Sequence, residues 1–141
     1  MNAPRTNHIE MTTRDTKPLP RDPALSVIGA TMVICSIAEA IAGSRHAFFS
    51  FRTGHTSAAT YLGAGMSVLY IFAGTLVLTA KKSAAAMALC ILAAVILGHV
   101  AMVITELYPA DSVPQLFAIT LATSVACAFF VLIAMKWDSF V

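Results

Sequence analysis

The sequence has little charge for its length, and this absence decides its class. Only 11% of the 141 residues are charged, whereas 58% are hydrophobic, and the mean hydropathy is +0.80. That proportion leaves too little polar surface to cover a water-soluble globule of this size. We therefore expect a membrane protein, with the lipid bilayer as its first partner.

Sequence patterns that mark common enzymes are also absent. There is no phosphate-binding glycine loop, no HExxH and no arrangement of Ser, His and Asp typical of hydrolases. The net charge is only +2, and the basic residues do not form one face, which argues against nucleic-acid binding. The sequence favours a non-enzymatic role and requires no cofactor.

The three cysteines have none of the spacings that hold metals or haem. Cys35, Cys90 and Cys127 lie within apolar runs and form no CxxC or CxxCH motif. We interpret them as small buried hydrophobic residues. Attachment of a metal or haem through cysteine is the alternative.

The sequence does contain four apolar runs of membrane-spanning length. They cover about residues 24–47, 57–80, 83–105 and 113–135. A helix needs about 20 apolar residues to cross a hydrocarbon core about 30 Å thick. We predict an all-α, polytopic membrane protein with a four-transmembrane-helix bundle. Residues 1–22 form its polar cytoplasmic tail, and residues 23–141 form a single membrane domain.

The first predicted helix has a clear start. Asp22 is suited to accept hydrogen bonds from free backbone N–H groups, and Pro23 has no N–H that would remain unpaired.

The distribution of Lys and Arg predicts the orientation of the bundle. Seven of the nine lie in the tail, at Lys81-Lys82 or at Lys136, on the side of the two termini. Arg45 and Arg52 lie on the opposite side. Cytoplasmic segments carry an excess of Lys and Arg, so we expect an N-in/C-in, multi-pass protein. Its composition suits a bacterial inner membrane.

Small residues on the first two apolar runs predict packing faces. Gly29, Ser36 and Gly43 recur every seven residues, and Gly63 and Ser67 have small-xxx-small spacing. Small side chains let membrane helices approach closely. We expect these residues to lie at helix interfaces.

The connection between the first two runs alternates aromatic and charged residues. Such a segment suits the headgroup boundary of a bilayer, where rings face the apolar edge and guanidinium groups face phosphates. A contact surface for a partner subunit is the alternative. The interface candidates in this segment are Phe48, Phe49, Phe51 and Arg52.

A carboxylate interrupts the first apolar run. Glu39 is expected to face a bundle interior or a polar cavity, because ionisable groups are costly in hydrocarbon. Glu39 and His46 are seven residues apart and share a helix face, as do His99 and Glu106 on the third run. All four are predicted to lie towards the outer side. The candidate ligand- or proton-binding residues are Glu39, Arg45, His46, His99, Glu106 and Tyr61.

This predicted cluster is compatible with four roles. Glu39 could pair with Arg45 or accept a hydrogen bond from His99, and so fix helix packing. A desolvated carboxylate could instead exchange a proton for a cation. His46 and His99, with Glu39 or Glu106, could bind a metal or haem. His99 and Tyr61 could also line a quinone pocket.

The segment Ser36-Ile37-Ala38-Glu39-Ala40-Ile41-Ala42-Gly43 resembles the first helix of small multidrug resistance transporters. Those are four-helix proteins of about this size, in which a first-helix glutamate binds protons and cationic drugs alternately. The resemblance implies that role for Glu39. It covers eight residues, and the family's Pro-, Trp- and Gly-patterned later helices have no counterpart here, so we assign no family from it.

We expect a small, non-catalytic accessory or assembly subunit of a larger membrane complex, with other membrane subunits or copies of itself as partners. One alternative is a proton-coupled transporter of a small solute or cation, acting as a homo-oligomer around Glu39. Another is a redox subunit that binds a quinone, haem or a metal through His46 and His99.

Overall fold

The computed structural model describes residues 22–44, 47–48, 51–52, 57–108 and 113–141, with side-chain detail for 22–41, 61–108 and 113–141. Four long helices follow one another along the chain, and each is long and apolar enough to span a membrane. The predicted all-α, four-helix membrane architecture is thus confirmed. The helices are α1 (Pro23–Ser44), α2 (Ser57–Leu78), α3 (Lys82–Ile104) and α4 (Val113–Met135).

Two very short strands lie between α1 and α2, and the sequence analysis did not predict them. β1 (Ala47–Phe48) pairs antiparallel with β2 (Phe51–Arg52), so that Phe48 lies opposite Phe51. A two-residue pairing is too short to show the alternation that identifies strands in a sequence.

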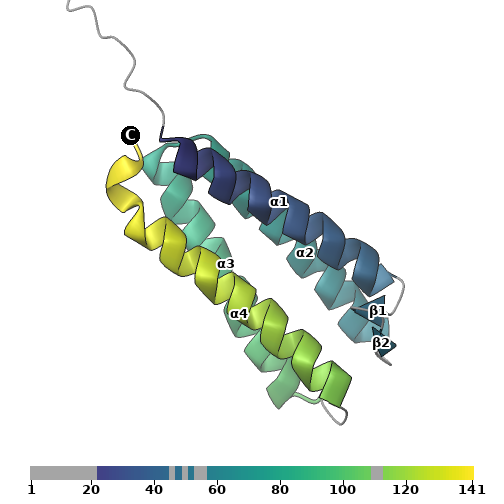
Figure 1. Cartoon of the computed structure of the whole chain (residues 1–141). Coiled ribbons are helices and arrows are strands. Elements are labelled where there is room, and N and C mark those ends of the chain that lie inside the picture. Colours follow the sequence, from purple (N-terminus) through teal and green to yellow (C-terminus); the bar gives the residue numbers. More distant parts are fainter. Residues whose placement is uncertain (1–21, 45–46, 49–50, 53–56, 109–112) are drawn as a thin grey trace, which may run out of the picture.

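The helices form two antiparallel hairpins, α1 with α2 and α3 with α4, and α2 also packs against α3 (Figure 1). α1 has 22 residues and is therefore about 33 Å long, enough to cross the hydrocarbon core. A tight turn joins α2 to α3, and a short 3-10 helix, η1 (Trp137–Ser139), follows α4. Both described ends of the chain lie at the same end of the bundle, which we call the closed end. The opposite end, which holds β1, β2 and the α3–α4 connection, is the loop end.

The apolar core is concentrated towards the closed end. All four helices and the residue after η1 contribute to the main cluster, which includes Met32, Val77, Leu92, Ile133 and Phe140. Towards the loop end, a second cluster contains only three buried residues, Met102, Tyr108 and Ile119. They come from α3, the α3–α4 connection and α4. Met66 of α2 packs against this second cluster, so the hairpins also touch here, but the larger part of their shared core lies at the closed end.

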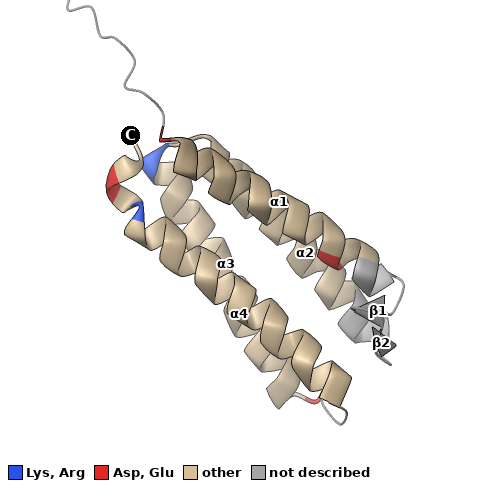
Figure 2. Cartoon of the chain, viewed as in Figure 1, with Lys and Arg blue, Asp and Glu red and all other residues tan. Residues whose placement is uncertain are grey.

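Charged residues lie near the helix ends, with one acidic position inside α1 (Figure 2). Within the described part of the chain, the lysines are Lys81, Lys82 and Lys136, all at the closed end. The positive-inside rule predicts that this end faces the cytoplasm.

Backbone hydrogen bonds also join distant segments at the closed end. Val141 N–H donates to the carbonyl of Ala80, and Lys82 N–H donates to the carbonyl of Val141, both at 2.9 Å. The side chain of Phe140 is only 2% exposed. The segment after η1 is thereby fastened to the α2–α3 turn.

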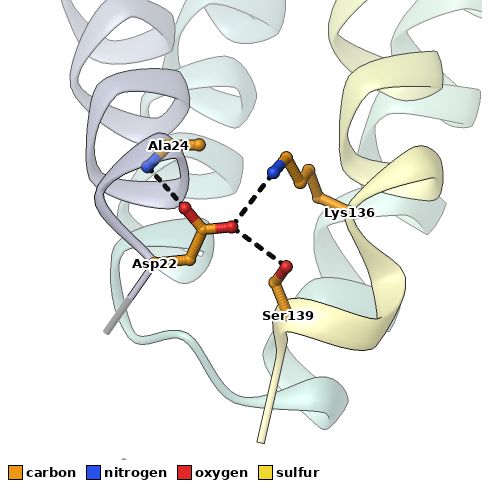
Figure 3. A network of polar contacts seen from close by, with 4 residues as sticks. All are labelled: Asp22, Ala24, Lys136 and Ser139. Atoms are coloured by element: carbon orange, nitrogen blue, oxygen red, sulfur yellow. Dashed lines mark hydrogen bonds and ion pairs between the residues drawn. The ribbon is translucent and has the colours of Figure 1, made fainter. Parts of the chain in front are cut away.

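Asp22 connects the start of α1 to the segment after α4 (Figure 3). One carboxylate oxygen accepts a hydrogen bond from Ala24 N–H at 2.9 Å, which confirms the predicted helix start. The other lies 3.1 Å from Lys136 Nζ and 3.0 Å from Ser139 Oγ. Asp22 and Lys136 are 114 residues apart in sequence, so the ion pair could not be inferred from local spacing.

We expect the stability of the closed end to fall in acid because of Asp22. The Ala24 N–H, Lys136 and Ser139 hold the pKa of Asp22 below its ordinary value of 3.8. A depressed carboxylate pKa adds stability that is fully present above the unfolded value and is lost as the pH falls through the folded value. Wild type should therefore be more stable than Asp22→Asn at pH 7. The difference should begin to shrink below about pH 4 and disappear only when the pH is below the folded pKa of Asp22.

Thermal unfolding in detergent at a series of pH values measures this difference. Lys81→Met is the control, because Lys81 is an exposed lysine at the same end that makes no ion pair with a described residue. The prediction fails if Asp22→Asn follows wild type in parallel over the whole pH range.

Candidate functional site

The crossing of α1 and α2 sets the position of the membrane carboxylate. A Cβ added to Gly29 would lie 2.9 Å from the Gly74 carbonyl oxygen and 2.8 Å from Leu78 side-chain atoms. Glycine is therefore required for the two backbones to approach this closely. Because the helices are antiparallel, moving two turns along each helix from this crossing places Ser36 near the level of Ser67.

Glu39 lies one turn beyond Ser36, in the half of α1 nearer the loop end. Its side chain is partly exposed, and α1 has no buried residue from Ile37 to Ile41. Glu39 forms no hydrogen bond or ion pair with any described residue. An ionisable group placed in this way within a membrane helix is costly unless another group satisfies it.

Tyr70 contributes a second unsatisfied polar group on the neighbouring helix. Its side chain is 3% exposed, and its hydroxyl has no hydrogen-bond partner within the described part of the structure. Its ring packs edge-on against Phe129, with 6.2 Å between ring centroids. Tyr70 lies within electrostatic range of Glu39. The two groups without a described partner therefore belong to neighbouring helices, α1 and α2.

His99 belongs to the other hairpin. It is 4% exposed, and its Nδ1 lies 3.4 Å from Thr123 Oγ1 of α4. The Thr123 hydroxyl donates its single hydrogen to the Ile119 carbonyl at 2.8 Å. The His99 contact is therefore best satisfied with Nδ1–H as the donor, which leaves Nε2 as an acceptor in the neutral ring.

A groove of about 540 Å³ lies between α3 and α4 beside this histidine. Apolar residues such as Val103, Ile104 and Leu116 form much of its lining. Its polar lining residues are His99 and three α4 residues, Thr120, Thr123 and Ser124, with the thiol of Cys127 beyond them. The groove therefore combines an apolar lining with hydrogen-bonding groups from both helices.

The structure does not bring the predicted cluster together in the described part of the chain. No hydrogen bond or ion pair joins Glu39 to His99, and His99 instead contacts α4. Glu106 is exposed after α3, and Tyr61 is 79% exposed near the start of α2. Arg45 and His46 lie outside the described residues.

The predicted packing residues have different environments. Gly29 is buried against α2, and buried Ser36 and Ser67 donate hydrogen bonds to carbonyls in their own helices. A Cβ on Gly63 would meet nothing within 4 Å, so its role in packing stays a prediction. The side chains of Gly43, Phe48, Phe51 and Arg52, and all of Phe49, lie outside the described part.

The sequence analysis overlooked several residues of these sites. Thr120, Thr123, Ser124 and Cys127 have the i, i+3, i+4, i+7 spacing of one helix face, which is a visible signal. Tyr70 is a polar aromatic residue in the middle of an apolar run, and a buried tyrosine hydroxyl usually has a hydrogen-bond partner.

No group of three or more His, Cys, Asp or Glu able to hold a metal ion occurs among the residues that the structure describes. The chain matches no protein-family model, and comparisons with curated proteins and with solved structures also give no match.

Proposed function

We propose that this protein is a small integral membrane subunit of a larger membrane complex. In this proposal, the loop-end half of the α1–α2 hairpin packs against a helix of a neighbouring membrane protein. The observation that carries it is the environment of Glu39, which is partly exposed on α1 and has no described partner. A carboxylate in this position is stabilised when protein, and not lipid, covers it.

The adjacent surface of α2 supports the same conclusion. A Cβ added to Gly63 would meet nothing within 4 Å, so no other described residue occupies this position on α2. Small residues let a second helix approach closely. The carboxylate of Glu39 is stabilised in the membrane by a hydrogen-bond donor or a cation. The partner is therefore an apolar membrane helix that carries such a side chain at the depth of Glu39.

The test is purification from native membranes in a mild detergent, followed by size measurement and mass spectrometry. Wild type should co-purify with a different membrane protein. Gly63→Leu, which blocks close approach, and Glu39→Gln, which removes the charge, should each lower its recovery at least tenfold. Ala128→Leu is the matched control, because it enlarges an exposed small residue on α4. A wild-type protein that runs alone as a monomer or homodimer contradicts the proposal.

A second candidate function is proton-coupled transport of a cation or small solute. The observation in its favour is the buried, unpartnered hydroxyl of Tyr70 within electrostatic range of Glu39. A carboxyl that alternately holds a proton and a cation would use such a neighbouring hydroxyl as a ligand or hydrogen-bond donor.

Transport into liposomes driven by a proton gradient tests this candidate. Glu39→Gln should abolish coupled uptake, while the exposed-site variant Ala128→Leu should transport like wild type. Equal uptake by Glu39→Gln and wild type would exclude a carrier built around this carboxylate.

A further inference from the structure

We propose that the groove between α3 and α4 binds a membrane amphiphile whose hydroxyl head group donates a hydrogen bond to His99 Nε2 and whose tail lies along the apolar wall. The proposal concerns the second hairpin and does not depend on the function proposed for α1 and α2. Quinols and long-chain isoprenoid alcohols share the required chemistry.

The first argument is the orientation of the imidazole. His99 is only 4% exposed. The contact between its Nδ1 atom and Thr123 joins the imidazole ring of α3 to α4. Because Thr123 donates its own hydrogen to Ile119, the His99 ring is left with an acceptor nitrogen. His99 makes no other hydrogen bond with the described part of the chain.

The second argument is the shape and chemistry of the groove. Its volume of about 540 Å³ lies within the range of about 300–1,000 Å³ that small-molecule sites occupy. Val103, Ile104 and Leu116 contribute apolar side chains to the lining, and Thr120 and Ser124 contribute hydroxyl-bearing ones. An amphiphile satisfies both parts of this lining at once, whereas a purely apolar acyl chain leaves His99 without a donor.

The tautomer of His99 determines which head groups the groove should prefer. An acceptor at Nε2 favours a head group that carries O–H over one that carries only carbonyl oxygens. A quinol should therefore bind more tightly than the quinone with the same tail. An isoprenoid alcohol should likewise bind more tightly than its methyl ether.

The test measures binding to the full chain in lipid nanodiscs by native mass spectrometry under anaerobic conditions. The probes are decylubiquinol with decylubiquinone, and farnesol with farnesyl methyl ether. At least one hydroxyl probe should bind tenfold or more tightly than its partner without a hydroxyl. The pair with the larger preference distinguishes a ring-bearing head group from a linear alcohol.

Two variants locate the site, with a matched control. His99→Leu removes the acceptor, and Thr120→Leu fills the groove from an exposed position while leaving the His99–Thr123 contact in place. Both should lower hydroxyl-probe binding at least tenfold. Thr75→Leu makes the same change at an exposed α2 threonine outside the groove and should bind like wild type.

Three outcomes would overturn the inference. One is equal binding of the hydroxyl probes and their partners, and another is unchanged binding in both Thr120→Leu and His99→Leu. The third is a dimer in which a second copy covers this face and excludes every probe.

Discussion

Replacing Gly29 with alanine should destabilise the protein by about 1–3 kcal/mol, the usual effect of overpacking a close interface. The added Cβ would lie 2.9 Å from the backbone oxygen of Gly74, which cannot move aside as a flexible side chain can. α1 and α2 must then separate, which weakens the van der Waals contacts between them in the half of the hairpin nearer the closed end. Membrane helices depend on such contacts because lipid is as apolar as the helices themselves.

Gly63→Ala makes the same change where an added Cβ meets nothing within 4 Å. It should be neutral, or stabilising by up to about 1 kcal/mol because alanine has the higher helix propensity. Unfolding of the two variants in mixed micelles, titrated with a denaturing detergent, measures the contrast. Equal effects of the two substitutions would mean that α1 and α2 do not cross at Gly29.

Tyr70→Phe should stabilise the protein by about 1–3 kcal/mol, the cost of leaving a buried hydroxyl without a partner. The substitution removes the unsatisfied oxygen and keeps the ring that packs edge-on against Phe129. Tyr70→Ala, which also removes the ring from the core, should instead cost about 3–5 kcal/mol.

The same unfolding assay distinguishes the possible roles of the hydroxyl. A loss of stability in Tyr70→Phe would refute the prediction and show that the hydroxyl has a partner in the folded protein. A gain in stability together with lost uptake in liposomes would indicate a hydroxyl kept for transport at the expense of stability.

The sequence was sufficient to predict the class and number of helices. Uninterrupted apolar length identifies a membrane helix almost independently of tertiary contacts, and Asp22-Pro23 marks the first helix boundary through local backbone chemistry. The predicted small-residue face on α1 includes Gly29, which does lie at a close crossing.

The arrangement of the polar residues was harder to predict. Depth and helical periodicity place Glu39 and His99 in the same half of the bundle, but they do not reveal which helix each residue faces. In the structure α1 lies beside α2, and His99 of α3 contacts Thr123 of α4. A hydrogen bond between Glu39 and His99, one of the alternatives considered for Glu39, required α1 and α3 to be neighbours. Neighbour relations depend on packing of the whole bundle, which a single sequence does not encode in any short motif.

The uneven core also has a consequence for the surrounding lipids. The hairpins are close at the closed end and farther apart at the loop end (Figure 1). A wedge of this outline occupies more lateral area in one leaflet than in the other. Any change in the angle between the hairpins would therefore do work against the lateral pressure of that leaflet. The angle between the hairpins should therefore depend on the curvature of the bilayer and on its acyl-chain composition.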